Sequence, residues 1–252
     1  MNLNKLLEVV KEAALKGGEE ILKIYDTDFS VEEKDDNSPL TQADKNANAV
    51  IEEILKETNI PILSEEGRSI DYSERKDWEY LWIVDPLDGT KEFVKRNGEF
   101  TVNIALIKKG VPILGVIYVP VKEWLYYGHK EIGSFKIENG ELEKLPRQIT
   151  KEKYVAVGSR SHKSPETEAY FNELSEEHGE IEIVSMGSSL KICLVAEGAA
   201  DEYPRFAPTM EWDTAAGHAI AKYAGKQFID YKTKNEMVYN REELLNNWFL
   251  VK

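Results

Sequence analysis

The most informative stretch of this chain is Trp82–Thr90, which reads WIVDPLDGT. It overlaps the apolar run Tyr80–Val84, which is typical of a strand buried on both faces. We expect this strand to end at Asp85-Pro86, because proline lacks the N–H group that a β-ladder needs. Asp85 would then lie at the C-terminal tip of the strand, where α/β folds bind their ligands.

The rest of the stretch brings further polar groups to this tip. A turn can direct Asp85 and Asp88 into one space, Gly89 leaves room for close backbone approach, and Thr90 is placed to begin a helix whose N–H groups bind an anion. Two adjacent carboxylates raise each other's pKa unless they share a cation. Ligands that are all oxygen favour a hard ion, so Mg²⁺ is expected before Zn²⁺ or Cu²⁺.

Ordinary turns also contain Asp-Pro and Asp-Gly, and the helix dipole alone explains an acidic residue at a helix start. Three other segments favour the metal interpretation. Glu65 follows a short apolar strand at 61–63, Asp44 lies near the start of one expected helix, and Asp213 lies near the start of another. Acidic groups that come from distant element ends predict a metal cage.

The remaining pattern predicts two halves with a cleft between them. Residues 1–150 are expected to form an α+β half, with an amphipathic helix at 3–25, a second helix after Thr41 and strands at 101–107, 113–119 and 124–128. A polar linker at 146–153 precedes an α/β half at 151–252, where strands alternate with helices.

Composition excludes several classes of protein. The 252 residues carry a formal net charge of −14 and are 42% hydrophobic, which argues against disorder and against a nucleic-acid-coating role. The single cysteine, Cys193, excludes an internal disulfide and cysteine-based zinc clusters. No transmembrane segment or signal peptide is indicated, so we expect a soluble, cytoplasmic protein.

Val84–Thr90 together with Glu211–Gly217 (EWDTAAG) resembles the two signatures of the inositol monophosphatase superfamily, the lithium-sensitive, magnesium-dependent phosphatases. Asp85–Phe93, Arg96–Leu106 and Gly187–Gly198 are more similar to its CysQ branch, the 3'(2'),5'-bisphosphate nucleotidases. Inositol monophosphatases usually have Thr-Asn-Phe where this chain has Lys-Glu-Phe at 91–93. The resemblance covers essentially the whole chain and implies a layered αβαβα sandwich.

This resemblance also implies the metal ligands. Glu65, Asp85 and the backbone carbonyl of Leu87 would hold one Mg²⁺ ion, and Asp85, Asp88 and Asp213 would hold a second. The branch leaves room for a third, weaker ion near Glu65 and its neighbour Glu66.

The same resemblance assigns catalytic and phosphate-binding roles. Asp44 and Thr90 would orient and deprotonate the attacking water, with the threonine hydroxyl acting as a relay to a carboxylate. The backbone N–H groups of Gly89 and Thr90 would bind the phosphate that is cleaved.

Substrate choice would depend on other residues. Ser188, Lys191 and Arg205 would hold the second phosphate and the sugar of a bisphosphate nucleotide, and His162 would lie near the base. Without the resemblance, Arg205 would be interpreted as an ordinary surface arginine, Lys191 as a solvated helix lysine and His162 as a loop histidine. The implied reaction converts adenosine 3',5'-bisphosphate into AMP and phosphate. Family members are monomers or homodimers, and some associate peripherally with the inner membrane.

Three alternatives stay open at this point. A haloacid-dehalogenase-like phosphatase needs Asp-x-Asp, which the spacing of Asp85 and Asp88 disfavours. An inositol monophosphatase or fructose-1,6-bisphosphatase would keep the fold and change the substrate. A non-catalytic metal-dependent protein would lack part of the water-activating pair, yet Asp44 and Thr90 are both present.

Overall fold

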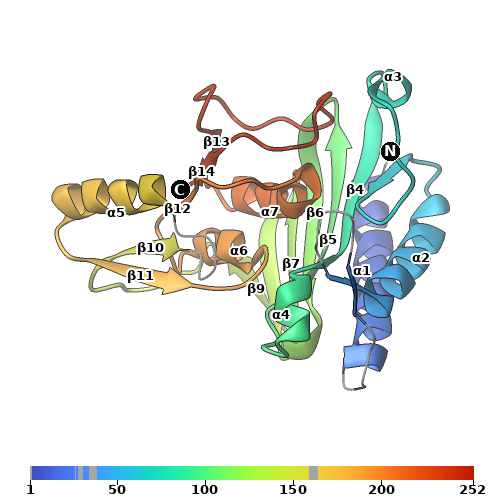
Figure 1. The fold of residues 1–252 in the computed structure, drawn as a ribbon, viewed down its shortest axis with the longest axis horizontal. Coiled ribbons are helices and arrows are strands. Elements are labelled where there is room, and N and C mark those ends of the chain that lie inside the picture. Colours follow the sequence, from blue (N-terminus) through green and yellow to red (C-terminus); the bar gives the residue numbers. More distant parts are fainter. Residues whose placement is uncertain (1, 26, 28–30, 34–38, 159–163) are drawn as a thin grey trace.

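The fold is built around a seven-stranded sheet in the order β3-β4-β5-β6-β7-β8-β9 (Figure 1). This computed structural model describes residues 2–25, 27, 31–33, 39–158 and 164–252. Strand β3 is parallel to β4, and all later neighbours are antiparallel. The strands are β3 (Ile62–Ser64), β4 (Tyr80–Asp88), β5 (Thr101–Lys108), β6 (Val111–Val119), β7 (Trp124–His129), β8 (Gly133–Glu138) and β9 (Glu141–Leu145).

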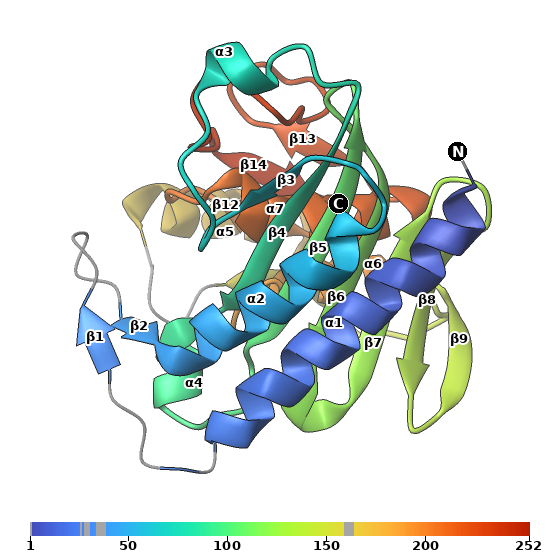
Figure 2. The same cartoon turned by 90° about the vertical axis from the view of Figure 1, so that its right-hand side faces the viewer.

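Two long helices, α1 (Leu3–Tyr25) and α2 (Gln42–Lys56), lie side by side on one face of this sheet (Figure 2). Their apolar residues recur at helical spacing and pack against the sheet, as Val10, Ile21 and Ile51 illustrate. The short elements on this side and at the ends of the sheet are β1 (Val31–Glu33), β2 (Pro39–Thr41), α3 (Tyr72–Arg75), α4 (Thr90–Val94) and η1 (Pro120–Lys122).

Helices α6 (Leu190–Glu197) and α7 (Glu211–Tyr223) cover the opposite face. A Cβ added at Gly115 of β6 would lie 2.5 Å from the carbonyl oxygen of Ala216, and one at Gly128 of β7 would lie 2.5 Å from that of Ala219. Both distances are far below van der Waals contact, so glycine at these two positions allows α7 to lie directly on the sheet.

A second β layer lies beyond these helices. Parallel strands β10 (Tyr154–Gly158) and β11 (Ile181–Ser185) are joined to β12 (Tyr203–Arg205) by a 2.7 Å hydrogen bond from the N–H of Val157 to the carbonyl of Glu202. Strand β14 (Phe249–Val251) lies between β12 and β13 (Phe228–Asp230), and α5 (Pro165–His178) covers the outside. The predicted αβαβα sandwich is confirmed.

One prediction about the main sheet is wrong. Strand β4 does not end at Asp85-Pro86 but continues to Asp88, which pairs with Thr101 of β5. The ladder is irregular between Asp85 and Asp88, so Pro86 lies where regular pairing is already interrupted and its missing N–H costs little.

The apolar core crosses the expected boundary near residue 150. One cluster combines Leu81 and Ile117 of the main sheet with Val195 of α6 and Ile220 of α7. The division into parts 1–150 and 151–252 therefore stays a prediction. Among the described residues, no helix combines the length and hydropathy that a membrane crossing needs.

Candidate active site

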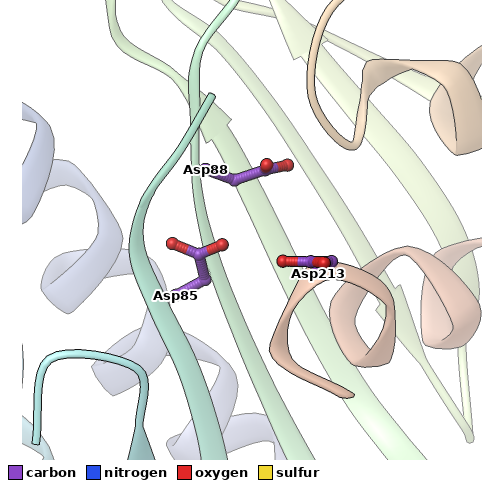
Figure 3. Close-up of side chains that lie close together, drawn as sticks. All are labelled: Asp85, Asp88 and Asp213. Carbon is purple, nitrogen blue, oxygen red and sulfur yellow. The ribbon is translucent and has the colours of Figure 1, made fainter. Parts of the chain in front are cut away.

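Three aspartates from two distant segments of the chain meet at the end of β4. Asp85 and Asp88 come from β4, Asp213 comes from the first turn of α7, and each offers a carboxylate oxygen within 4.8 Å of the others (Figure 3). The expectation that these three carboxylates converge is confirmed. Asp85 is 1% exposed, whereas Asp88 and Asp213 are partly exposed.

The irregular end of β4 explains how one strand contributes two of these groups. Residues i and i+3 of a regular strand point to opposite faces, and the register shift between Asp85 and Asp88 removes that constraint. The N–H of Leu87 donates a 3.1 Å hydrogen bond to Oδ1 of Asp85. Gly89 then adopts φ +90°, and α4 begins at Thr90 as the sequence predicted.

Charge repulsion dominates the electrostatics of this cluster. Burial raises the pKa of Asp85 well above its ordinary value, and the charges of Glu65, Asp88 and their acidic neighbours add to that effect. Burial followed by the charge of Asp88 raises the pKa of Asp213 to about 8. A shared divalent cation would relieve this repulsion, and the all-oxygen donor set fits Mg²⁺.

Two more predicted residues belong to the same electrostatic neighbourhood. Glu65 follows β3 directly, and its N–H donates to the carbonyl of Val84 at 3.1 Å, which places it beside the end of β4. Asp44 lies in the first turn of α2 and is 2% exposed. Both negative charges contribute to the raised pKa of Asp85.

Backbone and side-chain donors hold the other two aspartates. Oδ2 of Asp213 accepts a 2.7 Å hydrogen bond from the N–H of Met210, at the start of α7. Oδ2 of Asp88 accepts hydrogen bonds from both the N–H and the hydroxyl of Ser189, each at 2.7 Å. Ser189 was not among the residues that sequence reasoning selected. Its place before α6 resembles an N-cap, yet its side chain makes no capping hydrogen bond.

The expected substrate residues surround the loop that ends in Ser189. The Ser188 hydroxyl lies 2.9 Å from the carbonyl oxygen of Asp88 and 2.7 Å from that of Glu99. The Lys191 ammonium donates to the carbonyls of Ser188 at 2.7 Å and Met186 at 3.2 Å, and burial lowers its pKa to about 8. Both side chains therefore support the loop, and their contacts with substrate stay predictions.

Arg205 lies on β12, and its guanidinium donates to the carbonyl of Pro208 at 3.1 Å. Its buried Nε has no hydrogen-bond partner within the part of the chain that the structure describes. The positive charge of Arg205 partly opposes the rise in the pKa of Asp213, and it adds to the effect of burial, which lowers the pKa of Lys191. His162 lies outside the described residues.

The layered fold and its carboxylate cluster define an α/β protein with a centre suited to hard divalent cations. Comparison with known proteins gives the particular family. A sequence model of the inositol monophosphatase family matches residues 2–250, and the chain belongs to this family.

Proteins of the CysQ branch are among the relatives of this chain. The 3'(2'),5'-bisphosphate nucleotidase CysQ of Salmonella typhimurium is 46% identical over 250 residues, which cover 98% of this chain and 99% of that protein. The crystal structure of CysQ from Bacteroides thetaiotaomicron superposes with a TM-score of 0.92 at 52% identity, covering 98% of this chain and 97% of that one. An inositol monophosphatase from Anabaena has a TM-score of 0.77 at 27% identity, covering 100% and 92% of the two chains.

Proposed function

We propose that this protein is a Mg²⁺-dependent, lithium-sensitive phosphatase of the cytoplasm that removes the 3'-phosphate of adenosine 3',5'-bisphosphate, with AMP and phosphate as products. The observation that carries the proposal is the convergence of Asp85, Asp88 and Asp213 in a chain similar to CysQ proteins along its whole length. A phosphate monoester is a suitable substrate for such a centre because its hydrolysis depends on electrostatic stabilisation.

Five residues would hold two Mg²⁺ ions. Glu65, Asp85 and the Leu87 carbonyl would bind one ion, and Asp85, Asp88 and Asp213 the other. When bound, these ions would supply Lewis-acid stabilisation of the charge on the phosphate oxygens. The raised pKa values of Asp85 and Asp213 support this assignment, because buried carboxylates that repel one another are stabilised by a shared cation.

The water-activating role belongs to Asp44 and Thr90. A threonine hydroxyl is too weak a base to act alone, so Thr90 would orient the attacking water and pass its proton to the Asp44 carboxylate. The water oxygen forms a bond to phosphorus while the bond from phosphorus to the 3'-oxygen breaks, and the departing 3'-oxygen takes a proton from solvent to become the 3'-hydroxyl of AMP. The backbone N–H groups of Gly89 and Thr90 would hold the phosphate during this exchange.

Ser188, Lys191 and Arg205 would bind the second phosphate and the sugar, and His162 would lie near the base. The Nε of Arg205, which has no partner among the described residues, supports this role, because a buried N–H without a partner is costly and an anion would satisfy it. Lys191 keeps its positive charge below a pH of about 8. Its charge at neutral pH suits a doubly phosphorylated ligand.

A phosphate-release panel tests the proposal. With Mg²⁺ present, we expect turnover of adenosine 3',5'-bisphosphate to exceed that of inositol monophosphate and fructose 1,6-bisphosphate, and Li⁺ to inhibit it. Asp88→Asn and Thr90→Ala should each abolish phosphate release from a folded protein. Arg205→Ala should reduce turnover of the bisphosphate nucleotide far more than that of a generic monophosphate ester. Preferred turnover of inositol monophosphate would instead support the second candidate, for which the Anabaena structure is the relevant likeness.

A further inference from the structure

The two oxygens of the Asp88 carboxylate have different surroundings. Oδ2 accepts the N–H and the hydroxyl of Ser189, both at 2.7 Å. Two longer contacts reach the same atom, from Nδ2 of Asn103 at 3.3 Å and from the hydroxyl of Thr101 at 3.4 Å. A carboxylate oxygen has about two lone-pair sites, so these donors saturate Oδ2 and leave Oδ1 as the oxygen available to a cation.

Ser189 also contacts the segment that carries Asp213. Its hydroxyl lies 2.8 Å from the carbonyl oxygen of Asp213 and accepts a 2.9 Å hydrogen bond from Nδ2 of Asn103. Ser189 is 4% exposed and Asn103 is 1% exposed, so water does not compete easily for these bonds. One buried hydroxyl therefore lies between the strand that presents Asp88 and the helix that presents Asp213.

We infer that Ser189 and Asn103 are positioning residues of the cation site: they restrict Asp88 to binding a cation through Oδ1 alone and fix its orientation relative to Asp213. The inference rests on the metal site of the proposed function but not on the identity of the substrate. Ser189 acts through Asp88, so its loss should weaken cation binding even in a protein that folds normally.

Capping of α6 would be the ordinary use of a serine at this position. The Ser189 side chain makes no such bond, and its backbone is already helical, with φ −69° and ψ −5°. Removal of the hydroxyl should therefore cost α6 little, and the effect should appear at Asp88.

Isothermal titration of the full-length, chelator-treated protein with Mg²⁺ tests the inference. We expect Ser189→Ala to weaken the Kd for Mg²⁺ about tenfold, which corresponds to about 1.4 kcal/mol. Asn103→Leu replaces the amide with an apolar side chain of similar shape and so removes the Nδ2 donor. It should weaken Mg²⁺ binding by a smaller factor than Ser189→Ala. Mg²⁺ addition should shift carboxylate infrared bands of the wild-type protein. The band that is missing in Asp88→Asn should shift as expected for a carboxylate that binds the cation through one oxygen.

Ser134→Ala is the matched control. The Ser134 hydroxyl is buried and donates a 2.7 Å hydrogen bond to the carbonyl of Ile220, farther along the same helix α7. The Ser134→Ala variant should lose about as much thermal stability as Ser189→Ala, and its Kd for Mg²⁺ should stay within twofold of the wild type. An unchanged or tighter Kd in Ser189→Ala, or two-oxygen binding by Asp88, overturns the inference.

Asp213→Asn separates this inference from the proposed function. If Asp213→Asn weakens Mg²⁺ binding and Ser189→Ala does not, the positioning role fails and the metal site stands. If Asp213→Asn also leaves the Kd unchanged, the metal site itself is wrong, and the positioning role fails with it.

Discussion

Gly89→Ala is the substitution whose cost the structure defines most directly. Gly89 has φ +90°, a conformation that costs other residues roughly 1–2 kcal/mol. A Cβ at this position would also collide with Oγ of Ser188. Ser188 would have to leave the carbonyls of Asp88 and Glu99, which loses a hydrogen bond worth about 1 kcal/mol. The expected loss is ~2–3 kcal/mol in the free energy of unfolding.

The collision also acts on the site itself, because Gly89 lies between Asp88 and Thr90. A displacement of about 1 Å in a catalytic group lowers the rate on the order of 100-fold. We therefore expect kcat for phosphate release to fall about 100-fold in Gly89→Ala, measured at saturating Mg²⁺. Urea unfolding of the same preparation would give the change in stability.

Gly140→Ala is the control for backbone strain alone. Gly140 has φ +77° in the turn between β8 and β9, and a Cβ there would meet no atom within 4 Å. This variant should lose roughly 1–2 kcal/mol of stability and keep full activity. Full activity in Gly89→Ala, with a stability loss no larger than that of Gly140→Ala, would refute the reasoning.

Three further predictions concern charge and burial. Because burial lowers the pKa of Lys191 to about 8, its positive charge is lost as pH rises through that value; kcat/KM for the bisphosphate nucleotide should decline above pH 8, and Lys191→Met should abolish this decline. The pKa of the Asp213 carboxyl is raised from 3.8 to about 8. The contribution of its protonation to the free energy of unfolding is therefore full below pH 4 and is lost as pH rises towards 8. Thermal melting should therefore show a larger stabilisation by Mg²⁺ at pH 8 than at pH 5, and an equal gain at both would contradict this linkage. Arg75 is 2% exposed and donates to three acceptors in segment 240–242. Arg75→Met should lower the free energy of unfolding by about 3 kcal/mol in urea titrations, and a loss under 1 kcal/mol would show that these bonds contribute little.

Local patterns predicted much of the fold because their signals lie within short segments. The apolar spacing of residues 3–25 identified α1, and the acidic groups at element ends identified Asp85, Asp88 and Asp213. The same pattern selected Glu65, and the resemblance to a known family added its role as a ligand, which its electrostatic effect on Asp85 fits but does not test.

Other features depended on context that no short segment contains. Pro86 was interpreted as the end of a strand, although the irregular ladder allows it to lie inside β4. Strands β8 and β9 were missed because charged residues obscure their alternation, even though Asn139-Gly140 is a typical hairpin turn. Ser189 bonds to Asp88 across a separation of 101 positions, and Asn103 bonds to Ser189 across 86. Only the folded chain brings these residues together.

The position of β14 has a consequence for how the protein is made. Phe249 in this strand pairs with Arg205 of β12, and β14 lies between β12 and β13. During translation, residues 249–251 leave the ribosome after every other strand of the described chain. The Asp85–Asp88 segment of a nascent polypeptide is therefore synthesised early. Strand β14, the central strand that pairs with β12, is added late. A product that stops before Phe249 would keep its acidic segment and lose the alignment of Arg205.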